Sequence, residues 1–191
     1  MTVAEATAAS SPIININDVR HDFIVPIEVK GSTVNFTLDD DTSAYALLNI
    51  IKGLPKTDTD VHREVRRRIA VHSQATAEIL QMLSTDRQAW VRRAVANHKN
   101  TPQSLLTELA NDTSIDVRVA VAQNNNTPVG TLQVLAEDES TMVRSWAFDH
   151  PEMSTEILIR SLQEKSPLVY RKVLEELVRR AYPEANVPES V

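Results

Sequence analysis

The sequence predicts an all-α fold: a right-handed α-solenoid of 26-residue helix-pair repeats, with a small β-hairpin and a helix covering its N-terminal end. The main observation is an apolar pattern that recurs every 26 residues from residue 60 onward. Within each period the apolar residues form two short stripes at helical spacing. In addition, 42% of the 191 residues are hydrophobic and 24% are charged, which is typical of a globular chain.

One column of valines carries the period. Each of the first four valines is followed by an arginine, whereas Tyr170 follows the fifth. Each unit opens after an aspartate, so that the units run 61–86, 87–112, 113–138 and 139–164, with a partial fifth unit from 165. The three columns are Val65, Val91, Val117, Val143 and Val169; Arg66, Arg92, Arg118 and Arg144; and Asp60, Asp86, Asp112 and Asp138.

The second unit illustrates how each repeat forms two helices. Asp86 is expected to be the N-cap of the first helix, because Val91 and Val95 then follow at helical spacing. Thr101 is expected to cap the second helix and Pro102 to be its first residue, where a missing N–H costs nothing. Helices of about ten residues cannot bury their apolar stripes alone, so successive pairs must stack into one core over residues 59–182.

The fourth and fifth units depart from this pattern. In the fourth unit Ser154 or Thr155 is expected to cap the second helix, because the Thr-Pro pair is missing. In the fifth unit the last helix, about 167–182, is expected to close the solenoid with a polar outer face, and residues 183–191 are expected to be disordered. The residues of that polar face are Lys172, Glu175, Glu176, Arg179 and Arg180.

Residues 12–58 are expected to cap the N-terminal end, after a disordered start at 1–11. Residues 23–29 and 33–38 resemble the strands of a β-hairpin around Gly31, and 13–16 are a candidate third strand. Alternatively, the edge of this hairpin pairs with another chain, which would give a homodimer. A helix over 43–53, capped by Thr42, would cover the first repeat with the apolar side chains of Tyr45, Leu47, Leu48, Ile50 and Ile51.

The second and third units follow a known repeat pattern, VR-x-x-VA-x-N/H and then TP-x-x-x-L-x-x-LA-x-D. The string concerned begins at Asp86 and reads DRQAWVRRAVANHKNTPQSLLTELANDTSIDVRVAVAQNNNTPVGTLQVLAED. Over residues of about 60–164 the chain therefore resembles the leucine-rich repeat variant, and it is also similar to short HEAT repeats. The resemblance implies a repeat scaffold whose second helices are α or 3₁₀, and HEAT repeats usually serve as binding surfaces.

No pattern in the sequence points to catalysis. No Ser/His/Asp set or carboxylate pair occurs at a diagnostic spacing, and the absence of cysteine and the presence of only 3 glycines exclude thiolate metal sites and glycine-rich phosphate loops. We therefore expect a non-catalytic, cofactor-free scaffold that binds an unidentified protein partner along one face of the solenoid. The anchors are expected among residues that depart from the columns required by the fold: Arg67, Arg93, Trp90 and Trp146.

Two of these features leave alternatives open. Trp146 stands in the column of Ala94 and Ala120, so it either fills a widened core or protrudes as an anchor. Residues 61–110 contain 8 basic and 4 acidic residues in a chain of net charge −6, and this segment could bind nucleic acid instead of protein. The residues that would contact phosphate are Arg63, Arg66, Arg67, Arg68, Arg92 and Arg93.

Other periodic polar residues favour structural roles. The arginine column recurs with the aspartate column, which favours ion pairs that tie neighbouring units together. Another column contains His72, His98, Asn124 and His150. We expect these side chains to bind the last carbonyl groups of helices. A shared metal ion is not expected, because stacked helices stand about 8–10 Å apart, too far for their side-chain nitrogens to bind one ion. The sequence has neither an apolar run of membrane-spanning length nor a signal-peptide pattern, so we expect a cytoplasmic location and no membrane partner.

Overall fold

A computed structural model describes residues 23–29, 32–38, 41–54, 60–163 and 166–183 of the chain. The expectations for residues 1–11, for a third strand at 13–16, for the turn around Gly31 and for the tail from residue 184 lie outside this part. Strands β1 (Phe23–Val29) and β2 (Ser32–Leu38) are antiparallel neighbours, with Phe23 opposite Leu38 and Val29 opposite Ser32. Helix α1 (Ala44–Gly53) follows them.

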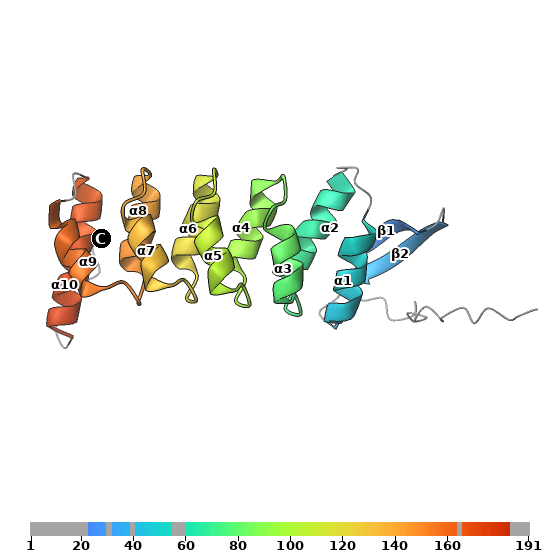
Figure 1. Ribbon diagram of the computed structural model, residues 1–191, viewed down its shortest axis with the longest axis horizontal. Helices are drawn as coiled ribbons and strands as arrows, with labels where there is room; N and C mark the ends of the chain where they lie inside the picture. The colour runs from blue at the N-terminus through green and yellow to red at the C-terminus, as the bar shows by residue number, and fades with distance from the viewer. Residues whose placement is uncertain (1–22, 30–31, 39–40, 55–59, 164–165, 184–191) are drawn as a thin grey trace, which may run out of the picture.

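The rest of the described chain is a row of helix pairs (Figure 1), as the 26-residue period predicts. The second helices are α-helical, and a short 3₁₀ turn, η1 (Ser161–Gln163), follows the last of them. The pairs are α2 (Asp60–Val71) with α3 (Ala77–Leu83), α4 (Ala89–Asn97) with α5 (Gln103–Leu109), α6 (Ile115–Gln123) with α7 (Val129–Ala136), and α8 (Thr141–Asp149) with α9 (Thr155–Arg160). Helix α10 (Pro167–Ala181) ends the row.

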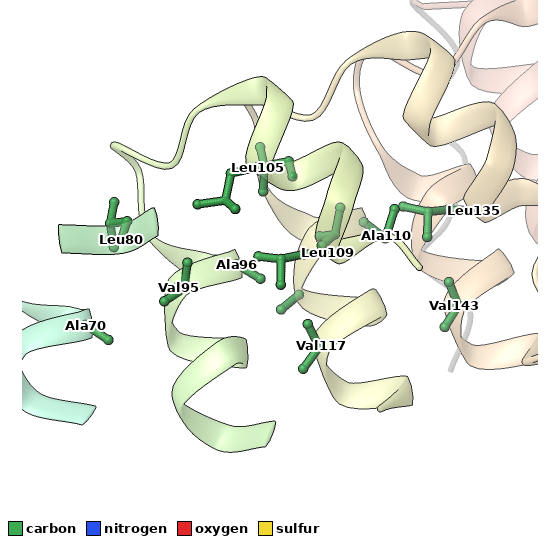
Figure 2. Close-up of a cluster of buried hydrophobic side chains, with 14 of the residues drawn as sticks. Ala70, Leu80, Val95, Ala96, Leu105, Leu109, Ala110, Val117, Leu135 and Val143 are labelled. Atoms are coloured by element: carbon green, nitrogen blue, oxygen red, sulfur yellow. The ribbon is translucent and has the colours of Figure 1, made fainter. Parts of the chain in front are cut away.

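The first helices of the units, α2, α4, α6, α8 and α10, pack directly on one another and form one layer. The second helices α3, α5, α7 and α9 form the other layer. The whole valine column and the leucines of the second helices are fully buried between the layers, and Figure 2 shows how Val95, Leu105 and Leu109 meet there. A continuous core therefore replaces the separate small cores that the single pairs could not sustain. The predicted right-handed sense stays a prediction.

Helix α1 covers the first repeat by packing on α2 and α3. Its Leu47 and Ile50 are buried, as predicted, whereas Tyr45 is exposed, contrary to the prediction, because it lies on the opposite side of the helix. The N-cap is Ser43, not Thr42, and its hydroxyl accepts a hydrogen bond from the N–H of Ala46 at 3.3 Å. In the described part of the chain, none of the helices combines the length and apolar character needed to cross a bilayer.

Besides Thr42, two predicted helix caps in the repeats are wrong. Asp86 lies two residues before the N-cap Gln88, whose N–H it binds at 2.8 Å, so the carboxylate forms a turn that leads into α4 instead of capping it. The N-cap of α5 is Pro102, and the hydroxyl of Thr101 donates to the carbonyl of Val95 at the end of α4. Each threonine–proline pair thus joins the two helices of its unit. The N-cap of α9 is Ser154, one of the two predicted residues.

Candidate functional site

The arginine column forms ion pairs with the aspartate column, as predicted: each arginine binds the aspartate that leads into the first helix of the next unit. The Nε atoms of Arg66, Arg92 and Arg118 lie 2.5, 2.6 and 2.7 Å from carboxylate oxygens of aspartates twenty positions further along the chain. In the last two pairs the Nη2 atom also donates to the second carboxylate oxygen, so the contact is bidentate. The aspartates are Asp86, Asp112 and Asp138.

Arg92 and Arg118 also bind the backbone of the aspartate that precedes their own helix. The Nη1 atoms of Arg92 and Arg118 donate to the carbonyl oxygens of Asp86 and Asp112, at 2.7 and 2.8 Å. Burial raises the pKa of the Asp112 carboxyl, but hydrogen bonds from Arg92 and from the N–H of Ser114 outweigh burial and bring the pKa below its usual value. The pair is therefore charged at neutral pH. Arg66 and Arg92, two residues of the predicted phosphate site, are used for holding units together.

The histidine column forms a second ladder between units. The Nε2 atom of His98 lies 3.0 Å from the carbonyl oxygen of His72, one repeat earlier, and its Nδ1 accepts from the N–H of Asn100 at 3.0 Å. Asn124 and His150 make the corresponding contacts with the carbonyls of His98 and Asn124. These side chains therefore bind carbonyls at helix ends, as predicted, but those of the preceding unit. Among the described residues no three metal-binding side chains converge.

This ladder predicts a sensitivity to acid. Burial lowers the pKa of His98 below 6.5, although its contact with the His72 carbonyl acts in the opposite direction. As the pH falls, His98 is therefore protonated in the unfolded chain before it is protonated in the folded protein. The stability that neutral His98 contributes above pH 6.5 is lost as the pH falls toward the pKa of His98 in the folded protein. We expect His98→Asn, which copies Asn124, to lose less free energy of unfolding than the wild type between about pH 7 and pH 5, by urea titration. Equal losses would contradict this role of His98.

The remaining predicted arginines differ in how free they are. Arg67 and Arg68 both bind Glu64, with N···O distances of 2.7 and 3.0 Å. The hydrogen bond from Arg67 is the main reason that the pKa of Glu64 falls to about 2, against the opposing effect of its burial. Arg93, at the position of α4 equivalent to Arg67, is exposed and makes no hydrogen bond or ion pair with a described residue. Four of the six predicted phosphate ligands are thus paired with carboxylates, and Arg93 is available.

The two tryptophans lie on the outer side of the first-helix layer. Trp90 is half-buried and packs against the core from α4. Trp146 is 41% exposed, so it does not fill the core, where Ala120 at the equivalent position of α6 is buried. The ammonium of Lys172, one repeat further on, lies 5.6 Å from the centre of the Trp146 ring and also pairs with Asp149. Trp146 is therefore held in place at the surface.

Other large apolar residues on the first helices, besides the tryptophans, were not predicted from the sequence to be at the surface. Met142, one helical turn before Trp146, is 56% exposed, and Ile115 on α6 and Leu168 on α10 are exposed in the neighbouring units. Together with the partly buried Trp90 and Val119, these residues lie on four successive first helices, and we call the set the first-helix band: Trp90, Ile115, Val119, Met142, Trp146 and Leu168. The signal was present in the sequence, because these positions hold large apolar residues outside the buried columns.

The comparisons with known proteins identify the repeat. A sequence model of the leucine rich repeat variant family matches residues 115–140. This stretch contains α6 and α7 and ends just before α8, so it corresponds to one full period of the solenoid. Neither a curated protein nor a solved structure matches the chain. Residues 115–140 therefore match a leucine rich repeat variant, and they lie within a row of helix pairs of the same period.

Proposed function

We propose that this protein is a non-catalytic cytoplasmic scaffold that binds a protein partner along the outer face of its first-helix layer. The observation that carries the proposal is the first-helix band, where large apolar side chains are exposed in successive units. Contiguous exposed apolar surface of this kind marks interaction sites on soluble proteins. The leucine rich repeat variant match agrees with a helical repeat module for protein interaction.

The charges beside the band indicate what its partner would carry. Arg93 is free and exposed, three residues after Trp90 on α4. A partner segment with apolar side chains along one side and a carboxylate facing Arg93 would bury the band and pair this cation. Trp146 and Met142, adjacent on α8, are the expected hot spot, because aromatic anchors in the middle of an interface contribute most to affinity.

A capture experiment tests this surface. The whole chain is immobilised and exposed to lysate as wild type, Met142→Glu, Arg93→Glu or Val134→Glu. Val134 is as exposed as Met142 but lies on α7 in the second-helix layer, so it is the matched control. We expect the proteins captured by the wild type and the control to be lost with Met142→Glu, by more than about 30-fold, and reduced with Arg93→Glu. Equal capture by all four proteins would contradict the proposal.

The alternative, nucleic-acid binding, is separated by a titration with duplex DNA and RNA at about 50 and about 200 mM salt. We expect no binding at the lower salt concentration, because Arg66, Arg67, Arg68 and Arg92 are already paired with carboxylates. Binding that weakens steeply with salt and disappears in Arg93→Glu would instead favour the nucleic-acid function.

A further inference from the structure

The last described helix exposes an apolar stripe, and the middle position of this stripe is buried in every earlier first helix. Tyr170, Leu174 and Val178 follow one another at intervals of four on α10 and are 39%, 37% and 43% exposed. The positions equivalent to Leu174 in the earlier first helices are held by Ala70, Ala96, Ala122 and Phe148, and all four are fully buried. The expected polar cap is therefore wrong in part: Glu175 and Arg179 are exposed, as expected, but Glu176 is buried and the apolar stripe is exposed as well.

The stripe lies on the face with which each first helix packs on the next one. Helix α4 packs on α6, α6 on α8 and α8 on α10, and Ala96 and Ala122 are buried on this side. The amide of Asn124 on the following unit, for example, donates to the carbonyl of Ala96 at 2.7 Å. On α10 the same face has no following helix in the described part of the chain. It is the continuation of the interface between units.

Glu176 distinguishes α10 from the other first helices. It occupies the column of His98, Asn124 and His150, where those helices end. It is buried and binds Arg179 and Arg180 one turn on, while Arg180 also donates to the carbonyl of Met153. The helix continues for 15 residues instead of 9, and it extends the apolar stripe to Val178.

We propose that two copies of this chain associate tail to tail, with the α10 stripes packed against each other in antiparallel orientation. A head-to-tail contact is closed, because α1 covers the opposite end of the solenoid through Leu47 and Ile50. A second copy can therefore meet the stripe only with its own α10. A symmetric contact pairs the same patch on both copies, and an apolar stripe is complementary to itself. Leu174, in the middle of the stripe, lies close to the two-fold axis.

The size of the stripe sets the strength of this contact. A helix of 15 residues is about 22 Å long. One such face covers less than the roughly 800 Å² per partner of a standard interface, so the expected dissociation constant is in the micromolar range. The pair should separate on dilution. This contact is on a different side of α10 from Leu168 and Lys172, so the first-helix band stays open in the dimer.

Sedimentation equilibrium of the whole chain from about 1 to about 200 µM tests the proposal, because mass action makes a weak dimer concentration-dependent. We expect a monomer–dimer equilibrium for the wild type and for the control Val134→Glu, and monomers for Leu174→Glu and for Leu174→Arg. An equimolar mixture of the two Leu174 variants should restore a dimer, because opposite charges then meet near the two-fold axis. Circular dichroism checks that each exposed-site variant is folded.

A second measurement does not depend on charge. The chain has no cysteine, so Leu174→Cys and Val134→Cys each introduce a single thiol. A short bismaleimide should link Leu174→Cys into dimers and leave Val134→Cys monomeric. The proposal is overturned if the wild type is monomeric at about 200 µM, or if the mixed Leu174 variants do not associate. It is also overturned if both charged Leu174 variants still dimerise, which is the result that pairing at the β-hairpin edge would give.

Discussion

Replacing Arg118 by alanine is expected to lower the free energy of unfolding by about 3–5 kcal/mol, because a buried ion pair loses one partner. The side chains of Arg118 and Asp138 are only 8% and 9% exposed, so the Asp138 carboxylate would be left in a poorly solvated place. The carbonyl of Asp112 would lose its hydrogen bond as well. Urea unfolding followed by circular dichroism measures the effect, and the loss should appear as a lower midpoint.

The control for this experiment is the exposed pair of Arg160 and Glu156, whose side chains are 61% and 82% exposed. Arg160→Ala should cost less than about 1 kcal/mol, because solvent screens such a pair and its geometry is loosely held. Asp138→Asn keeps an acceptor for the N–H of Ser140 and for Arg118 while it removes the charge, and we expect it to fall between the two. Similar losses for Arg118→Ala and Arg160→Ala would refute the idea that the arginine–aspartate pairs stabilise the stacked units.

Phe148→Ala is expected to cost about 3–5 kcal/mol through the cavity that it leaves. Phe148 is fully buried and stands in a column that holds Ala70, Ala96 and Ala122 in the three preceding units. An alanine is therefore acceptable at this position in three other units but not in the fourth, where α8 and α10 are placed around an aromatic ring. The same urea titration measures the loss.

The reciprocal change, Ala122→Phe, separates this explanation from a general preference for larger side chains. Helices α6 and α8 pack closely around Ala122, so an inserted ring should cost about 1–3 kcal/mol through overpacking. This explanation would be contradicted if Ala122→Phe were as stable as the wild type or more stable, or if Phe148→Ala lost less than about 1 kcal/mol of the free energy of unfolding. Either result would show that the α6–α8 and α8–α10 interfaces have the same width.

Local sequence rules failed where a distant residue competes for the same group. Asp86 is a good N-cap by its type, but Arg66, twenty residues earlier, and the N–H of Gln88 bind its carboxylate in the structure. Thr101 is likewise drawn to a carbonyl of the preceding helix. The C-terminal cap was partly misjudged because Glu176 pairs with Arg180 and is buried. Helical periodicity alone could not determine which side of α10 faces the neighbouring unit.

The period of 26 by itself determined the stacked helix pairs, the buried valine column and the pairing of arginine with aspartate. A regular repeat places equivalent residues in equivalent surroundings, so one unit predicts the others. The tertiary structure alone decided which carbonyl His98 binds, which apolar residues join Trp146 at the surface, and that the Leu174 face is left uncovered. The first two features depend on how one unit is oriented against the next, and no local sequence pattern encodes that orientation. The third depends on the absence of a following helix among the described residues.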